Sequence, residues 1–296
     1  PAGLEAAMSA GRRGYDVVLV EASRELGGRV ATEARLPGLA AWIRVVDYRK
    51  TQIDRLKNVE FFFESAMTVD EALTYEFDHI AVCTGSIWRR DGVGFSHTQP
   101  IELDREFEIL TPDDVMGGKR PAGRRVVVFD DDHYYLGGII AELMTKEDFA
   151  VSLVTPASEV SKWTNHTMEQ HRIQARLLDL GVNVITSHTV GRTSPTGVTV
   201  QSVYTNRGQM LECDAAIFVT SRLPNEGLYL DLLERRAAWG DAGLKSVRTV
   251  GDALSPGTIA SAVWDGRRFA EDLGRADDGG LFPWDVPQLS QIRIQR

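Results

Sequence analysis

The sequence contains few cysteines, no long apolar run and a shortage of basic charge. Its 296 residues include only two cysteines, Cys83 and Cys213. Two cysteines so far apart predict neither a metal site nor a disulfide framework, and they favour a reducing, cytoplasmic setting. No run of about 18 apolar residues occurs, so no membrane-spanning helix is predicted. The formal net charge of -9 argues against nucleic acid as a partner, because phosphate binding needs clustered Lys and Arg.

The amino-terminal stretch PAGLEAA carries one glycine, Gly3, and the apolar run 17–20 is followed by Glu21. Dinucleotide-binding βαβ units use this order, because glycines let the backbone approach a pyrophosphate at a helix amino terminus. An acid about 20 residues later accepts hydrogen bonds from the ribose. We therefore predict that Gly3 and Glu21 contact a nucleotide. The first strand and the first two glycines of the pattern are missing, so we interpret the chain as a fragment.

Two further turns are candidates for the same site. Gly27 and Gly28 precede Arg29, and such a turn can bring backbone amides and a guanidinium to a diphosphate. An ordinary Gly-Gly loop with a solvated arginine is the alternative. The apolar run 246–250 is followed by Gly251 and Asp252, which can aim a carboxylate at a bound nucleotide.

Apolar runs that alternate with helical segments predict parallel, doubly wound sheets. Residues 14–21 and 147–155 match one another, which indicates an internal duplication of a Rossmann unit. The runs that we predict as strands are 59–63, 79–83, 125–129, 150–155 and 215–220.

This pattern predicts two domains, the second inserted in the first. Residues 1–115 and 243–296 would form an ADP/FAD-type dinucleotide-binding domain, and residues 116–242 a degenerate NAD-binding-like domain. Within the second domain, short runs separated by turns predict a β-meander at 182–213. The polar, turn-rich stretch 89–121 is interpreted as a crossing between the domains.

The second domain lacks the residues that bind a nicotinamide cofactor. Asp130, Asp131 and Asp132 stand where a pyrophosphate turn would be, and three acids repel a diphosphate. Thr155 and Pro156 follow its second strand, in place of an acid for NAD or an arginine for NADP. We therefore expect this domain to keep its fold without binding the cofactor. The alternative of an acidic metal site lacks further ligands that would converge with these acids.

Taken together, these residues resemble the two-dinucleotide-binding flavoprotein fold of glutathione reductase. A closer resemblance is to the carboxy-terminal half of the trimethylamine and dimethylamine dehydrogenases, relatives of histamine dehydrogenase. It is carried by PAGLEAA at the start, LPGL at 36–39, DYRKTQI at 47–53, TGSIW at 84–88, LTP at 110–112, VVVFDDDHYYLGG at 126–138 and TVGDA at 249–253.

The resemblance implies the fold class predicted above, two Rossmann-like doubly wound domains of the glutathione-reductase type. It also implies FMN and a four-iron cluster in a region upstream, which would hold the catalytic groups and the cluster cysteines. This chain would bind ADP as a structural nucleotide, the enzyme would be a homodimer, and an electron-transfer flavoprotein would accept its electrons. The implied nucleotide contacts are Gly3, Glu21, Gly27, Gly28, Arg29, Ala66, Met67, Thr84, Gly85 and Asp252.

Three alternatives stay open at the level of the sequence. A relative of the NADPH-dependent 2,4-dienoyl-CoA reductases would need a glycine turn after Phe129 and a basic group near Thr155. A demethylase of betaine-type substrates is compatible with these residues. A nucleotide-binding scaffold without a redox role is the third.

Overall fold

The computed structural model describes residues 1–205 and 207–275, which form two compact units. Unit 1 comprises Pro1–Val30, Arg44–Gly85 and the chain from Asn225 onward, and unit 2 comprises Ala31–Ile43 and Ser86–Pro224. The sequence predicted domain boundaries near residues 116 and 243. The assignment of a nucleotide-binding and a degenerate domain to these ranges stays a prediction. The end of the predicted first domain, 276–296, lies outside the described residues. No helix among the described residues has the length and apolar character needed to cross a membrane.

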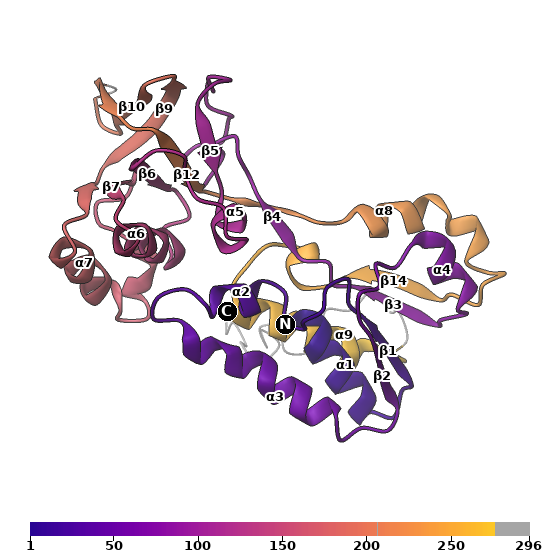
Figure 1. Cartoon of the computed structure of the whole chain (residues 1–296). Coiled ribbons are helices and arrows are strands. Elements are labelled where there is room, and N and C mark those ends of the chain that lie inside the picture. Colours follow the sequence, from indigo (N-terminus) through magenta and orange to yellow (C-terminus); the bar gives the residue numbers. More distant parts are fainter. Residues whose placement is uncertain (206, 276–296) are drawn as a thin grey trace, which may run out of the picture. The chain divides into compact units, whose positions relative to one another are not determined.

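Unit 1 arranges its strands in two separate parallel ladders, β1 with β2 and β3 with β14 (Figure 1). Helix α2 (Arg29–Glu33) runs from unit 1 into unit 2. The other elements of unit 1 are α1 (Ala2–Arg12), β1 (Val17–Val20), α3 (Arg44–Ile53), β2 (Val59–Phe62), α4 (Val69–Thr74), β3 (His79–Val82), α8 (Gly227–Glu234), the 3-10 turn η3 (Arg236–Ala238), β14 (Ser246–Thr249), the 3-10 turn η4 (Gly251–Ala253) and α9 (Ile259–Asp272).

Small residues let α1 and α9 pack closely, and the two helices lie side by side in Figure 1. Ala2, Ala6 and Ala10 of α1 share a buried cluster with Phe269 of α9. A Cβ on Gly266 would lie 2.3 Å from the carbonyl oxygen of Ala2. Glycine is therefore required at position 266 for the helices to approach this closely.

A buried ion pair joins α3 to α1. Nε of Arg49 lies 2.7 Å from Oε2 of Glu5, and the two side chains are only 11% and 5% exposed. Ser9 donates its hydroxyl to the other oxygen of Glu5, and Arg49 also donates to the carbonyl oxygen of Val45. The charges are thus paired and hydrogen-bonded, which a buried ion pair needs to offset desolvation.

Unit 2 is built on a five-stranded parallel sheet of order β5-β12-β6-β7-β8. A three-stranded antiparallel sheet, β11-β10-β9, and a two-stranded ribbon, β13-β4, complete its strands. The elements are η1 (Ala40–Ile43), β4 (Ser86–Trp88), β5 (Glu108–Leu110), α5 (Pro112–Met116), β6 (Arg125–Asp130), α6 (Leu136–Lys146), β7 (Ala150–Val154), η2 (Lys162–Asn165), α7 (Gln170–Asp179), β8 (Asn183–Ile185), β9 (His188–Ser194), β10 (Gly197–Ser202), β11 (Gly208–Glu212), β12 (Ala215–Val219) and β13 (Arg222–Pro224).

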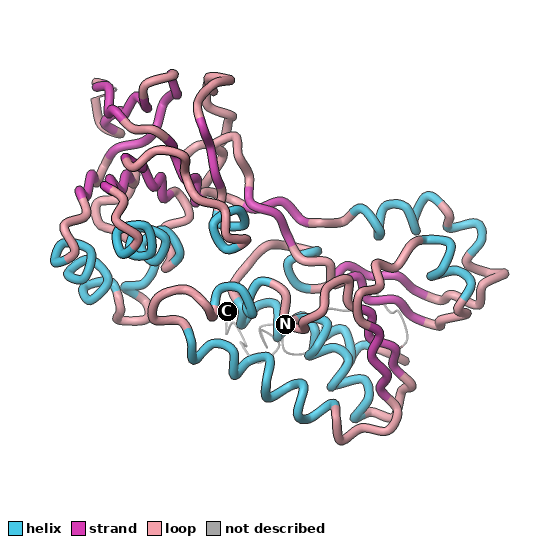
Figure 2. Tube along the Cα trace, viewed as in Figure 1, coloured by secondary structure: helices cyan, strands magenta, loops and turns pink. Residues whose placement is uncertain are grey.

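The two faces of the parallel sheet are covered by different structures (Figure 2). Val126 and Val128 of β6 share a buried cluster with residues of α5, α6 and α7. Val127 and Phe129, on the opposite face, share a second cluster with Val198 and other residues of β9 and β10. Unit 2 therefore has a helical layer, a parallel sheet and an antiparallel sheet.

The predicted fold class, two Rossmann-like doubly wound domains of the glutathione-reductase type, is wrong. A doubly wound sheet carries helices on both faces, whereas the second face of the unit 2 sheet is covered by β9 and β10. In unit 1 the described strands form two ladders and no continuous sheet. Continuous apolar strands indicate that both faces are buried, and they do not specify what covers each face. The predicted β-meander at 182–213 is confirmed as β9, β10 and β11.

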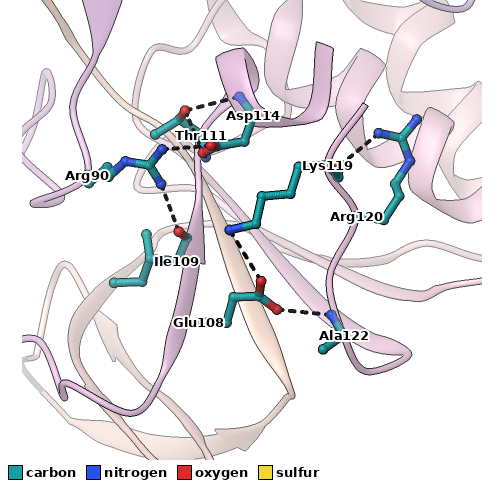
Figure 3. Close-up of polar contacts among 8 residues, drawn as sticks. All are labelled: Arg90, Glu108, Ile109, Thr111, Asp114, Lys119, Arg120 and Ala122. Atoms are coloured by element: carbon teal, nitrogen blue, oxygen red, sulfur yellow. Dashed lines mark hydrogen bonds and ion pairs between the residues drawn. The ribbon is translucent and has the colours of Figure 1, made fainter. Parts of the chain in front are cut away.

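The stretch 89–121, predicted as a crossing, instead supplies the edge strand β5 and helix α5 of unit 2 (Figure 3). Thr111 and Asp114 form a capping box at the start of α5, and Arg90 pairs with Asp114 at 2.7 Å. Glu108 of β5 pairs with Lys119 and accepts the backbone N–H of Ala122. These contacts fix both ends of the β5–α5 segment.

Asp130, the last residue of β6, and Asp131 after it are buried and bind the backbone of their own unit. The carboxylate of Asp131 accepts the N–H groups of Ser96 at 2.9 Å and His97 at 3.1 Å, and lies 3.1 Å from Nε2 of His133. Asp130 accepts the N–H of His133, and burial raises the pKa of Asp130 to about 7. Burial alone would lower the pKa of His133, but the neighbouring carboxylates, led by Asp131, raise it.

We expect Arg49→Met to lower the free energy of unfolding by about 3 to 5 kcal/mol, because it leaves the Glu5 carboxylate buried without its cation. Denaturant unfolding measures the change. The control is Arg24→Met, which breaks an ion pair with Glu64 whose side chains are 84% and 60% exposed. That variant should change stability by less than about 1 kcal/mol. Equal losses from the two variants would contradict a special role for burial.

We expect Asp130→Asn to stabilise the protein at pH 8 and to have little effect near pH 4. The pKa of Asp130 rises from an ordinary 3.8 to about 7 on folding, so the native state holds the proton more tightly. The contribution of Asp130 to the free energy of unfolding of the wild type is therefore fully present below about pH 4 and is lost as pH rises to about 7. The asparagine stays neutral, so its advantage at pH 8 should reach about 2 to 4 kcal/mol.

Denaturant unfolding at both pH values tests this expectation. Asp214→Asn is the control, because hydrogen bonds from Arg125 lower the pKa of Asp214. Its ionised form is therefore favoured by folding, and the variant should lose stability at pH 8. A gain for Asp130→Asn of the same size at both pH values would show that ionisation is not its cause.

Candidate functional site

The amino end of α1 lies between two strand ends of unit 1. A Cβ on Gly3 would lie 3.3 Å from Cβ of Cys83, the residue after β3, and 3.8 Å from Cδ1 of Leu19 in β1. Glu21 follows β1, and Thr84 and Gly85 follow Cys83. The structure therefore brings Gly3 to the segments that hold these predicted site residues.

The end of β14 reaches the same place. Gly251 has a positive φ of 69°, and a Cβ there would lie 2.6 Å from Cβ of Ala2. Asp252 is the next residue. Asp252 therefore directly follows a residue packed against Ala2, and Glu21 follows strand β1, whose Leu19 lies beside Gly3.

Arg29 is held by Asp252. Nη2 of Arg29 lies 3.4 Å from Oδ2 of Asp252, and the two side chains are 19% and 12% exposed. Asp252 accepts the N–H of Gly257 at 3.0 Å, and Arg29 donates to the carbonyl oxygen of Gly257 at 3.3 Å. The alternative of a solvated arginine after an ordinary glycine loop is therefore wrong, whereas a contact between Arg29 and a diphosphate stays a prediction.

The turn before Arg29 depends on glycine. Gly27 and Gly28 have φ values of 116° and 52°, which side-chain-bearing residues rarely adopt. A Cβ on Gly28 would meet no atom within 4 Å. Gly85 is similar, with φ of 78° and open space, and Thr84 beside it donates its hydroxyl to the carbonyl oxygen of Asn225. These turns leave room beside the strand ends.

Glu21 is oriented by its own loop. Its Oε1 accepts both the N–H and the hydroxyl of Ser23 at 2.9 Å. Its carbonyl oxygen accepts the N–H of Ser65 at 3.1 Å, which places the next residues, Ala66 and Met67, beside the end of β1. Ala66 is exposed, whereas Met67 is half-buried against the cluster of Ala72, Val82 and Leu232. The backbone at 66–67 is therefore the part available to a ligand.

The residues present fit a nucleoside diphosphate. Helix α1 begins without a side-chain cap, so the first N–H groups of its 11 residues have no acceptor from a capping side chain. Such a helix end favours a phosphate, Arg29 supplies a cation and Glu21 supplies an acceptor for hydroxyl groups. Each described strand of unit 1 contributes to this site at its carboxyl end. Glu21 follows β1, residues 66–67 follow β2, residues 84–85 follow β3, and Asp252 follows β14.

The sequence missed one polar residue of this region. Asp265, in the middle of α9, accepts the N–H of Gly251 at 2.6 Å. No motif marks position 265, because its partner is a backbone group 14 residues away. An acid on an amphipathic helix is usually solvent-exposed, so the pattern alone gave no signal.

Comparison with known proteins identifies relatives of both units. Residues 110–215, within unit 2, match the family model described as the OYE-like second alpha/beta domain. This match assigns the segment to a different domain family from the glutathione-reductase type that the sequence predicted. It is the second reason, with the sheet coverage, why that fold prediction is wrong.

The chain is 32% identical to dimethylamine dehydrogenase of Hyphomicrobium sp. (strain x), over 97% of this chain and 42% of that protein. The structure of histamine dehydrogenase from Rhizobium sp. 4-9 has a TM-score of 0.94 and 46% identity, over 96% of this chain and 44% of the other.

For 6-hydroxypseudooxynicotine amine oxidase from Pseudomonas geniculata N1 the TM-score is 0.88 and the identity 37%, over 93% of this chain and 41% of the other. The chain therefore spans less than half the length of each of these relatives. On these matches, the chain belongs to the family of amine-oxidising enzymes that includes dimethylamine dehydrogenase and histamine dehydrogenase.

Proposed function

We propose that the whole protein is an oxidoreductase that oxidatively demethylates a methylated amine, and that this chain is its carboxy-terminal, ADP-binding part. The proposal rests on the family and on the names of the relatives. FMN, held upstream together with a four-iron cluster, would accept the electrons of the amine. An electron-transfer flavoprotein would be the final acceptor, and the enzyme would act as a homodimer.

The single observation that carries the ADP proposal is the convergence of α1, the end of β1 that precedes Glu21, and the Arg29–Asp252 pair in unit 1. The N–H groups at the start of α1 and the guanidinium of Arg29 would hold the diphosphate, with the turn at Gly27 and Gly28 giving access. Glu21 would accept hydrogen bonds from the ribose.

The remaining contacts of the proposed site are made by backbone. The exposed segment at Ala66 and Met67 would lie against adenine, and the open turn at Thr84 and Gly85 would border the ligand together with Asp252. ADP without an attached flavin has no redox chemistry, so its role would be to stabilise unit 1.

The packing of unit 2 favours this reading over an NADPH-dependent reductase. A Cβ on Gly137, in the first turn of α6, would lie 2.5 Å from Cγ of Asp130. The Asp130 side chain therefore fills the space where a dinucleotide-binding turn approaches its phosphates. Asp131 and His133 are also buried.

Denaturing the full-length protein and identifying the released nucleotide tests the proposal, with NADPH oxidation and amine-dependent reduction of a dye assayed alongside. ADP without FAD, together with turnover of a methylated amine and none of NADPH, is the expected result. Released FAD with NADPH turnover would replace the proposal with the reductase. ADP with turnover only of betaine-type substrates would indicate the demethylase, and ADP without any turnover would indicate a scaffold.

We expect Glu21→Ala to weaken ADP binding by about 1 to 3 kcal/mol, because a hydrogen bond to a charged acceptor is lost. Calorimetric titration of the full-length protein with ADP measures the change. Glu60→Ala is the control, since Glu60 is an exposed acid on the neighbouring strand β2. Unchanged ADP affinity in Glu21→Ala would remove Glu21 from the site.

A further inference from the structure

Asp265 connects helix α9 to the turn that carries Asp252. Its carboxylate accepts the N–H of Gly251 at 2.6 Å, a short hydrogen bond to a charged acceptor. Gly251 adopts a positive φ of 69°, one of several conformations open to glycine. The hydrogen bond from Gly251 to Asp265 therefore selects the conformation of the η4 turn.

The η4 turn in turn fixes Arg29. Asp252 accepts the N–H of Gly257 and lies 3.4 Å from Arg29, which donates to the carbonyl oxygen of Gly257. The carboxylate of Asp252 and the carbonyl oxygen of Gly257, which bind the guanidinium, both belong to the segment 252–257 and are called its two anchors below. A change in the direction of the turn at Gly251 would move the two anchors together.

Asp265 is also fixed relative to the start of α1. The next residue of α9, Gly266, packs against the carbonyl oxygen of Ala2, and a Cβ there would lie only 2.3 Å from that oxygen. Position 265 can therefore shift little with respect to the first turn of α1. A carboxylate at position 265 therefore holds the Gly251 turn at a fixed distance from the amino end of α1, where N–H groups are available to a ligand.

We propose that Asp265 is a positioning residue that sets the distance between Arg29 and the amino end of α1, and so makes the site selective for a nucleoside diphosphate. The inference rests on the proposed ADP site and adds what determines its specificity. The two groups that bind phosphate are the helix end and the guanidinium. Asp265 would act on the phosphate-binding groups through Gly251, whose N–H it accepts, and through Asp252 in the same turn.

The test compares ADP and adenosine as ligands of the full-length protein after its bound nucleotide has been removed by dialysis. Calorimetric titrations are made on wild type, Asp265→Ala and Asp265→Asn. The asparagine keeps an oxygen that can accept the Gly251 N–H. The control is Glu271→Ala, because Glu271 pairs with Arg267 on the surface of the same helix. Asp265→Ser, with a shorter side chain, replaces the alanine variant if that one does not fold.

We expect Asp265→Ala to weaken ADP binding about 10-fold and to leave adenosine binding within about twofold, because only the phosphate-binding groups move. Asp265→Asn should restore ADP binding to within about threefold of wild type, and Glu271→Ala should not change it. Equal weakening for ADP and adenosine would show a general disturbance of the site and overturn the positioning role. So would unchanged ADP affinity in Asp265→Ala. Wild-type protein that binds adenosine but not ADP, or neither ligand, would overturn the ADP site itself and this role with it.

Discussion

The close approach of the first turn of α1 to two glycines is the constraint on which unit 1 depends. Ala2 lies against Gly251 at the end of β14 and against Gly266 in α9, and a Cβ on either glycine would lie within 2.6 Å of an Ala2 atom. This contact fixes where the helix begins relative to the strand ends. Together with the hydrogen bond from Gly251 to Asp265, it determines where Gly3, Asp252 and, through Asp252, Arg29 lie.

Charged groups in the two units are buried for different purposes. In unit 1, Arg49 pairs with Glu5 and ties α3 to α1, so the charge is balanced within the core. In unit 2, Asp131 accepts backbone N–H groups of a loop, and Asp130 is buried at the end of β6 with its pKa raised. The buried Asp130 therefore makes the stability of unit 2 depend on pH, because ionising its carboxyl group costs free energy in the folded state.

The sequence predicted the apolar parallel strands, but it missed the edge strand β5 and the architecture around the strands. Apolar runs located β6, β7 and β12, because a strand buried on both faces is apolar throughout. Gly3 and Asp252 could be placed together because a glycine at a helix start and an acid after a strand have definite local geometries. The coverage of each sheet face and the partner of Asp265 depend on contacts distant in the sequence, for which periodicity carries no signal.

The two units also differ at the start of a helix that carries a glycine in its first turn. In unit 1, Gly3 packs its bare Cα against Cys83 and Leu19, and the start of α1 has no side-chain cap. In unit 2, Asp130 lies against Gly137 in the first turn of α6, so a glycine there makes room for a side chain of the protein itself. A glycine at a helix start therefore does not identify a phosphate site. In unit 2 the side chain of Asp130 occupies the space that the glycine leaves, and the acids at 130–132 made that difference visible in the sequence.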